Sequence, residues 1–479
     1  MNRQEEQLTL FEYMYPLKRI TKPIRLIELF SGIGAQAKAL EILGVEFEHY
    51  KTCEWAYNSY CGYNAIHIKD KTDYACGLTK EELVEKVKGT SINYNEPLTI
   101  DQLYKKPIDW LANAYNNIVA THNLVNIMEV HGDDLEIVDK DKYEYVLTYS
   151  FPCQDLSNAG KGKGMSVSQA AGGTRSGLLW EVERILDECK GVLPQILIME
   201  NVPEVVGTKN INDFKKWEAK LRSLGYSNYV EILNAKNYGV PQNRRRCFMV
   251  SILGDYSYNF PCKMRLKHKL GDLLQKNVDE KYYLSDAFLN YASGVNYDNQ
   301  KYNRTKAFVT KLKKTNVDGI AGTITTREGG RSCDTFIVES EETLKKELCN
   351  SLVKNGMVQE GDIVKHSYTS KIMNGEKKCV EKSNEMIALT TRGDCVGVTV
   401  QEKGLRIRKL LPLECLKLMG FTKKDYQSLR DIGLSDAAIF HCAGDSIVTT
   451  VLLALFSQFF DNNIHIELIE KYLEFAYES

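Results

Sequence analysis

The residues Ile24–Phe30 (IRLIELF) form an apolar run that passes directly into the turn SGIGA and the stretch AQAKALEILG. A short run of branched aliphatic residues followed by a glycine turn predicts a buried β-strand. Leu40 and Leu43, with Gly44 as the C-terminal cap, predict that the following stretch is a helix. Strand, glycine turn and helix in this order are typical of the first unit of a nucleotide-binding α/β fold.

Apolar stretches farther along the chain predict more strands of the same sheet. These strands are expected at 143–150, 195–199, 229–234 and 247–252. Between two of them, residues 178–189 carry apolar side chains on one helical face, which predicts a crossover helix. The alternation of strands and helices predicts an α/β fold.

Other regions depart from this alternation. The stretch 62–130 has apolar residues at helical spacing in its second half, which predicts a helical insertion. From about 256 to 400 the pattern dissolves into short strands, turns and polar runs, including the similar pieces GTITTREGG (322–330) and ALTTRGDCVG (388–397). Near the C-terminus, a helix starting at Asp445 is expected to pack on the sheet through its apolar face.

The composition is that of a globular protein in a reducing compartment. Of the 479 residues, 43% are hydrophobic and 26% are charged, which is close to the average. The thirteen cysteines include no C-x2-C pair and the eight histidines show no ligand spacing, so we expect neither disulfides nor a metal site. No apolar run approaches the roughly 20 residues of a membrane span, and no signal segment is evident, so a cytoplasmic protein is expected.

The charge is unevenly distributed along the chain. The formal net charge is −1, which by itself argues mildly against a nucleic-acid partner. Residues 260–330, however, hold thirteen Lys or Arg against seven Asp or Glu, so a local basic surface is available. A solvated, loop-rich face would explain the same charges, and charge alone leaves both interpretations open.

Reactive and charged residues follow several expected strands at their C-terminal ends, where open α/β sheets build their sites. Glu54–Trp55 follows the second strand, Cys153 in SFPCQ follows the strand at 143–150, and Glu200 in MENV follows the next one. QNRRR (242–246) places three arginines before another strand, where they need phosphates, a base oxygen or a carboxylate as partners. A cysteine, a glutamate and an arginine at one edge would form a nucleophile, an acid and an anion clamp.

With these motifs in this order, the chain resembles the cytosine-C5 DNA methyltransferases of bacteria and phages. The motifs are FSGIG (30–34), EW (54–55), GD (132–133), PCQ (152–154), ENV (200–202), QNRRR (242–246), RKLLPLECLKLMGF (408–421) and GDS (444–446). Their joint order and spacing are highly specific. The resemblance implies a Rossmann-like mixed sheet with helices on both faces, and a smaller, irregular, strand-rich target-recognition domain.

The resemblance also implies S-adenosylmethionine as the cofactor. The residues implied to bind it are Phe30, Ser31, Gly32, Ile33, Gly34, Glu54, Trp55, Asp133, Asp134, Pro152, Leu178, Asp445 and Ser446. Among these, Glu54 is expected at the ribose, Trp55 at the face of the adenine and Asp133 at its amino group. The family usually has Asn where this chain has Asp445, which would put a negative charge near the carboxylate of the cofactor.

A covalent mechanism on double-stranded DNA is implied as well. Cys153 would add to C6 of a flipped-out cytosine, Glu200 would hold N3 and the exocyclic amine, and Arg246 would hold O2. Arg244 is expected in the same catalytic group, nearer the phosphate backbone. Residues expected to contact DNA are Gln154, Ser157, Gln242 and, from the two Thr-Thr-Arg turns, Arg327 and Arg392.

Four segments are expected along a monomeric protein. They are an N-terminal tail (1–23), the catalytic domain (24–255, with the insertion at 62–130), the target-recognition domain (256–421) and C-terminal helices that return to the catalytic domain (422–479). In the tail, QLTLF (Gln7–Phe11) resembles the peptide by which bacterial and phage proteins dock on the replicative sliding clamp. A terminal strand or staple on the catalytic domain is the alternative.

Other functions fit parts of the sequence. An RNA-directed methyltransferase would use the same motifs, but the long variable region favours the reading of duplex DNA. A catalytically silent DNA-binding protein would not need Cys153, Glu200 and Arg246 intact. A nicotinamide oxidoreductase would need a complete G-x-G-x-x-G turn, and position 37 is Ala.

Overall fold

The computed structural model describes residues 15–152, 156, 175–283, 313–316, 320–324, 326, 336–340, 362–366, 395–396, 405–460 and 464–478. Within these residues the chain divides into two compact units. Unit 1 takes its residues from 1–233, 245–264 and 447–472, and unit 2 from 234–244, 265–446 and 473–479.

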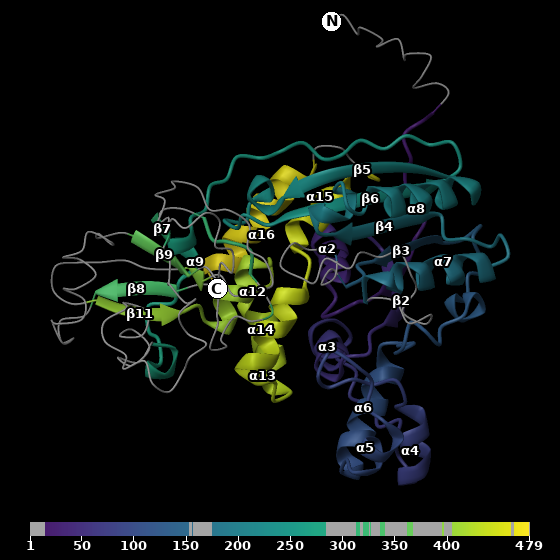
Figure 1. The fold of residues 1–479 in the computed structure, drawn as a ribbon, viewed down its shortest axis with the longest axis horizontal. Coiled ribbons are helices and arrows are strands. Elements are labelled where there is room, and N and C mark those ends of the chain that lie inside the picture. Colours follow the sequence, from purple (N-terminus) through teal and green to yellow (C-terminus); the bar gives the residue numbers. More distant parts are fainter. Residues whose placement is uncertain are drawn as a thin grey trace, which may run out of the picture. The chain divides into compact units, whose positions relative to one another are not determined.

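Unit 1 is built on a sheet with the strand order β2-β1-β3-β4-β6-β5 (Figure 1). The strands are β1 (Ile24–Leu29), β2 (Phe47–Cys53), β3 (Glu144–Tyr149), β4 (Ile196–Asn201), β5 (Tyr226–Asn234) and β6 (Arg245–Leu253). The first four strands in the sequence run parallel, and β6 pairs antiparallel with β4. β3 and β4 are buried along their whole length, as is typical of strands covered on both faces. The mixed α/β sheet expected from the sequence is confirmed.

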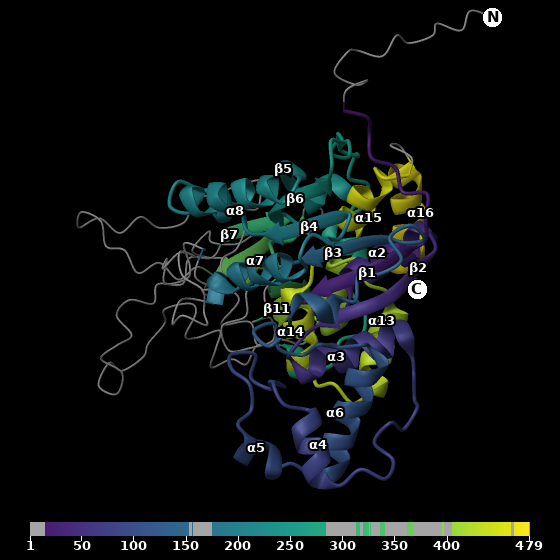
Figure 2. The same cartoon turned by 90° about the vertical axis from the view of Figure 1, so that its right-hand side faces the viewer.

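Helices cover both faces of this sheet. Figure 2 shows α7 (Leu179–Glu188) and α8 (Ile211–Ser223) on one side, and α2 (Ala35–Leu43) with α15 (Thr449–Ser457) on the other. The core on the α7 and α8 side combines alternate strand residues with one face of each helix, including Ile27, Leu147, Met199, Val182 and Trp217. This alternation follows from the two-residue period of a strand.

The chain between β2 and β3 forms a separate group of helices. These are α3 (Tyr57–Tyr63), the π-helical turn η1 (Asn64–Ile68), α4 (Lys80–Lys86), α5 (Ile100–Tyr104) and α6 (Ile108–Ala120). They enclose a hydrophobic cluster of their own, to which Tyr60, Leu83, Leu103 and Leu111 contribute. Capping boxes at Thr79 and Thr99 satisfy the first amides of α4 and α5.

The segment before β1 is fastened to unit 1. The Lys18 amide donates to the Ser257 carbonyl and the Ile20 amide to the Phe459 carbonyl. The Ile20 side chain is buried, so residues 15–23 cover part of the unit 1 core.

Among the described residues, one apolar stretch, Asp436–Ser457, has the length and hydropathy of a membrane span, but most of it is buried inside the protein. It comprises α14 (Asp436–Asp445) and α15. The predicted helix start at Asp445 is wrong, because Asp445 ends α14 and α15 begins at Thr449.

Unit 2 combines a small antiparallel sheet with helices. The described strands are β7 (Lys313–Asn316), β8 (Phe336–Ser340), β9 (Asp362–His366), β10 (Cys395–Val396) and β11 (Leu405–Lys409), in the order β10-β9-β8-β11, with β7 pairing β9. The helices include α9 (Leu270–Leu273), α12 (Pro412–Leu418), α13 (Lys423–Asp431) and α14. Arg408 and Glu414 form a fully buried ion pair, with Arg408 Nη1 2.9 Å from Glu414 Oε2.

Candidate active site

The carboxyl ends of the parallel strands meet at one edge of the unit 1 sheet. Leu29 of β1 lies opposite Cys53 of β2 and Tyr149 of β3, and Tyr149 lies opposite Met199 of β4. The segments that leave these strands are therefore neighbours. This edge is the usual ligand site of an open α/β sheet.

The glycine turn after β1 has a backbone shaped by its contacts to β2. Phe30 adopts a left-handed conformation with φ of 61°, and its amide donates to the Cys53 carbonyl at 2.7 Å. Ser31 is buried, and its Oγ has no hydrogen-bond partner among the described residues. A Cβ atom added to Gly32 would meet nothing within 4 Å. A buried hydroxyl beside open space suits the binding of a polar cofactor such as S-adenosylmethionine.

Glu54 holds the glycine turn while retaining capacity for a ligand. Its Oε2 accepts from the Gly32 amide at 2.9 Å and its Oε1 from the Ala56 amide at 2.8 Å. A carboxylate offers about four lone-pair positions, so ribose hydroxyls can still be accepted. Trp55 is half-buried and packs against the cluster of the inserted helices, which leaves part of its ring exposed.

Asn123 is a positioning residue that the sequence did not reveal. Its Oδ1 accepts from the Glu54 amide, and its Nδ2 donates to the Glu54 carbonyl, both at 2.9 Å. No local pattern marks it, because it lies in the turn after α6 and reaches Glu54 only through the tertiary fold.

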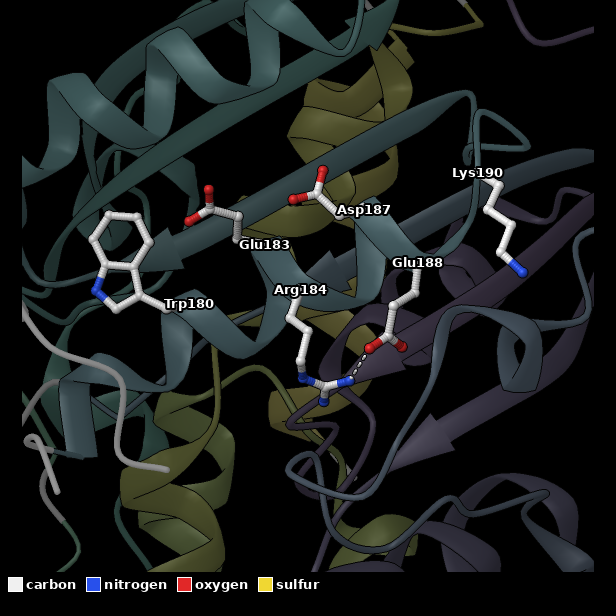
Figure 3. Close-up of a pocket in the computed structure, with 6 residues that line it drawn as sticks. All are labelled: Trp180, Glu183, Arg184, Asp187, Glu188 and Lys190. Atoms are coloured by element: carbon white, nitrogen blue, oxygen red, sulfur yellow. Dashed lines mark hydrogen bonds and ion pairs between the residues drawn. The ribbon is translucent and has the colours of Figure 1, made fainter. Parts of the chain in front are cut away.

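The Gly132–Asp133 turn is fixed by the C-terminal end of α7. Glu188 Oε2 accepts from the Gly132 amide at 3.0 Å, and Glu188 Oε1 pairs with Arg184 Nη1 at 2.9 Å (Figure 3). Asp133 is exposed, whereas Asp134 Oδ2 already accepts from the His131 amide at 2.7 Å. The turn therefore presents Asp133 to a ligand and uses Asp134 as a cap.

The hollow on the exposed side of α7 in Figure 3 is lined mainly by charged side chains. Its lining residues are Trp180, Glu183, Arg184, Asp187, Glu188 and Lys190. Arg184 pairs with Glu188, and Asp187 pairs with Lys220 of α8 at 2.7 Å. Within each pair the two charges neutralise each other, and the Asp187–Lys220 pair links α7 to α8.

Two side chains anchor the segment that leads to Cys153. Asn201 Nδ2 donates to the Phe151 carbonyl at 2.9 Å, and Ser176 Oγ donates to the Pro152 carbonyl at 2.7 Å. Asn201 belongs to the ENV motif, and Ser176 is fully buried. Successive carbonyls are thus fixed immediately before the expected nucleophile.

Glu200 and Arg246 come together on neighbouring strands. Arg246 Nε lies 3.0 Å from Glu200 Oε1, and only 16% and 11% of the two side chains are exposed. Glu200 lies opposite Phe248, so Arg246 is its diagonal neighbour on the same face of the sheet. The carboxylate and guanidinium that the sequence predicted at this edge therefore lie together there.

Other cysteines at this edge are poor nucleophiles. Burial, and then the negative charge of Glu200, raise the pKa of the Cys247 thiol to about 12. Burial, with a further contribution from Glu54, raises the pKa of Cys53 well above its usual value. Because the thiolate is the reactive form, both remain inert near neutral pH.

Arg244 and Gln242, which were expected near DNA, lie buried in unit 2. Arg244 is buried in unit 2 and donates to the carbonyls of Ile324, Gly444 and Ser446 at 2.8, 3.0 and 2.8 Å. Gln242 is fully buried. Its side-chain Nε2 donates to the Leu418 carbonyl, and its side-chain Oε1 accepts from the Ile324 backbone amide. These backbone contacts give both side chains a structural role in unit 2, and a contact of either one with a phosphate or a base stays a prediction.

Asp445, Ser446 and Leu178 were expected to bind the cofactor. Asp445 Oδ2 lies 3.0 Å from His441 Nδ1 on the same helix of unit 2, and Ser446 is buried there. Leu178 is buried in the unit 1 core that includes α7. Their contact with a cofactor stays a prediction.

Several expected site residues lie outside the described residues. They are Cys153, Gln154, Ser157, Arg327, Arg392 and the Gln7–Phe11 peptide.

Comparison with known families gives the decisive result. The model of the family "C-5 cytosine-specific DNA methylase" matches residues 103–461. The chain belongs to this family. It is a DNA (cytosine-5-)-methyltransferase, and S-adenosylmethionine is its methyl donor. The match includes the PCQ, ENV, QNRRR and GDS motifs.

Individual relatives agree with this assignment. The methyltransferase is 36% identical over 307 residues to the orphan methyltransferase M.SssI of Spiroplasma monobiae, covering 62% of this chain and 75% of that enzyme. It is 25% identical over 503 aligned positions to the orphan methyltransferase M.SPRI of Bacillus phage SPR, covering 93% and 99%.

A solved structure supports the fold. The crystal structure of the Dnmt2 methyltransferase of S. pombe superposes with a TM-score of 0.53 at 15% identity, covering 91% of this methyltransferase and 98% of that chain. At this level of identity the likeness concerns the fold alone.

Proposed function

We propose that this methyltransferase modifies a flipped-out cytosine in duplex DNA through a covalent bond between Cys153 Sγ and C6. The observation that carries the proposal is the ion pair of Glu200 and Arg246 at the sheet edge that the Pro152 segment also reaches. A cytosine placed there would meet an acid, a cation and a thiol. C5 of cytosine is a weak nucleophile, so the chemistry requires all three.

Side chains of the enzyme activate C5 of the cytosine for methyl transfer. The Cys153 thiolate adds to C6, and the electron pair of the C5–C6 double bond moves toward C4 and N3. Glu200, which must take up a proton from solvent when the base binds, shares that proton with N3. Arg246 holds O2 of the base and keeps Glu200 oriented. S-adenosylmethionine, when bound, supplies the electrophilic methyl group. Once C5 carries the methyl group, N3 returns its proton to Glu200, a base removes the C5 proton, the C5–C6 double bond reforms and the S–C6 bond breaks.

Residues of unit 1 would hold the cofactor. Ser31 and the amides of the glycine turn would contact its amino acid portion, Glu54 its ribose, and Trp55 with Asp133 its adenine. The orphaned Ser31 hydroxyl and the open space at Gly32 support this assignment.

The mechanism predicts a trapped adduct with DNA that contains 5-fluorocytosine, because fluorine at C5 leaves no proton to remove. The wild type should form a complex that survives denaturing electrophoresis, and Cys153→Ser should form none. Cys262→Ser is the matched control, since Cys262 is an exposed cysteine in the segment after β6. An adduct in Cys153→Ser, or none in an active wild type, would contradict the proposal.

We also propose that residues 256–421 read the DNA sequence. This region carries the excess of basic residues and the turns at Arg327 and Arg392. An arginine that reads a base should lose about 1–3 kcal/mol of discrimination at one position on replacement by Ala, whereas a phosphate contact should weaken all sequences alike and flatten the salt dependence. Unchanged affinity, selectivity and salt slope in both variants would exclude both turns from recognition.

The Gln7–Phe11 peptide would recruit the enzyme to a sliding clamp in the bacterial cytoplasm. Its Gln, Leu and Phe match the pattern of clamp-docking peptides. Purified clamp should retain the wild type, which we expect to be a monomer of 54.5 kDa, and should release a variant with Leu10→Ala and Phe11→Ala. Equal retention of the wild type and the variant by the clamp would contradict the proposed docking.

A further inference from the structure

A cluster of ionisable side chains lies directly beneath the glycine turn in unit 1. His67 of η1, Tyr63 of α3, His49 of β2 and Glu41 of α2 form it. The rings of His49 and His67 are 5.7 Å apart between centroids, and those of Tyr63 and His67 are 4.9 Å apart. None of these residues belongs to a motif that identified the family.

His67 bridges two acceptors. Its Nδ1 lies 2.5 Å from Glu41 Oε1, and its Nε2 lies 2.9 Å from the carbonyl oxygen of Ile33 in the glycine turn. The His67 side chain is fully buried. Both ring nitrogens of His67 therefore face oxygen atoms, one of them on the backbone of the glycine turn.

Two groups that adjoin His67 have shifted pKa values. Burial alone would raise the pKa of Glu41, but the hydrogen bond and charge of His67, with Lys38, lower it to about 2. Burial, and then the charge of His67, lower the pKa of His49 to about 4. His49 is therefore neutral near pH 7.

The glycine turn has no spare room above this cluster. Gly34 has φ of 78°, and a Cβ atom placed on it would come within 2.5 Å of His67 Nε2 and 2.7 Å of Tyr63 Cε2. His67 itself is presented by a π-helical turn, a feature that is frequent at functional sites. The Ile33–Gly34 peptide is thus held from below by one side chain.

We propose that His67 is a positioning residue for the cofactor: the contact of its ring Nε2 with the Ile33 carbonyl fixes the Ile33–Gly34 peptide and preorganises the glycine turn for S-adenosylmethionine. The proposal rests on the assignment of residues 30–34 to the cofactor. A turn that is ordered before binding loses less entropy on binding, so the effect belongs to cofactor affinity and not to the chemical step.

The test measures cofactor binding to the DNA-free protein by calorimetry, together with KM and kcat. His67→Ala should weaken the binding of S-adenosylmethionine and S-adenosylhomocysteine by about tenfold, the loss expected for one buried hydrogen bond. KM for S-adenosylmethionine should rise in parallel, while kcat at saturation stays within about twofold. His67→Gln, whose amide can still donate to Ile33, should recover part of the affinity.

His49→Ala is the matched control, because His49 shares the cluster but does not touch the turn. Thermal unfolding of both variants separates stability from affinity. Unchanged cofactor affinity in His67→Ala, or an equal loss in His49→Ala, would overturn the proposal. Ser31→Ala tests the cofactor assignment itself, because it removes the buried hydroxyl assigned to the cofactor at a position without a left-handed backbone. If Ser31→Ala weakens cofactor binding and the His67 variants do not, His67 has no positioning role. If Ser31→Ala also has no effect, the cofactor assignment of residues 30–34 falls, and the proposal falls with it.

Discussion

Arg246 Nε lies 3.0 Å from Glu200 Oε1, across two antiparallel strands that are adjacent in the unit 1 sheet. The register makes them diagonal neighbours on one face, so the strands themselves set their separation. Since the pair is mostly buried, the charge of each side chain is stabilised mainly by the opposite charge of the other.

Replacing Glu200 or Arg246 should distinguish an effect on turnover from an effect on stability. Glu200→Gln retains the shape but cannot deliver a proton at N3, so kcat should fall by several orders of magnitude while DNA affinity changes little. Arg246→Met leaves a buried carboxylate without its ion pair, which should lower both kcat and the free energy of unfolding, the latter by about 3 kcal/mol. Steady-state kinetics and urea unfolding measure these effects. A Glu200→Gln variant that lost only DNA affinity would show that Glu200 is structural.

Arg244 should behave as a structural residue of unit 2. Arg244→Met removes the donor to three backbone carbonyls and should lower the free energy of unfolding by about 3 kcal/mol or more. Arg245→Ala is the adjacent control, because Arg245 is exposed and should change stability by less than about 0.5 kcal/mol. If Arg244→Met were stable and altered the salt dependence of DNA binding, the result would instead support the phosphate contact expected from the sequence.

Glu28 should make stability depend on pH. It is fully buried below the glycine turn, and burial, opposed by the hydrogen bond from Tyr63, raises its pKa from 4.5 to about 8. The folded state therefore holds this proton more tightly, so the stabilisation is complete below pH 4.5 and is lost as the pH rises through about 8. Glu28→Gln should flatten the decline of Tm over this window. Glu46→Gln, at an exposed position, should keep the wild-type decline.

Gly132 should not tolerate a side chain. A Cβ atom there would lie 2.5 Å from both the Cys189 amide nitrogen and the Glu188 carbonyl carbon, and backbone cannot yield as a flexible side chain can. Gly132→Ala should therefore lower Tm and weaken S-adenosylmethionine by displacing Asp133. Gly207→Ala, with a nearest contact of 3.1 Å, should have a smaller effect on Tm and none on the cofactor. Wild-type cofactor affinity in Gly132→Ala would show that this turn does not position a cofactor-binding residue.

The sequence by itself determined the strand, glycine turn and helix at the start of the sheet, and the residues at its carboxyl edge. Local patterns suffice there, because a short apolar run between glycines has few alternatives, and parallel strands bring their ends to one edge. The positions of Glu54 and Glu200 followed from this rule alone.

Only the tertiary structure decided which polar residues serve the site. Gln242, Arg244 and Arg246 belong to one motif, yet two are buried in unit 2 and one meets Glu200. Arg244 finds its carbonyl partners 80, 200 and 202 positions away in the sequence, and the ring of His67 reaches the turn from 34 positions away. Local spacing carries no information about partners at such separations, because the folded chain alone brings them within hydrogen-bonding distance.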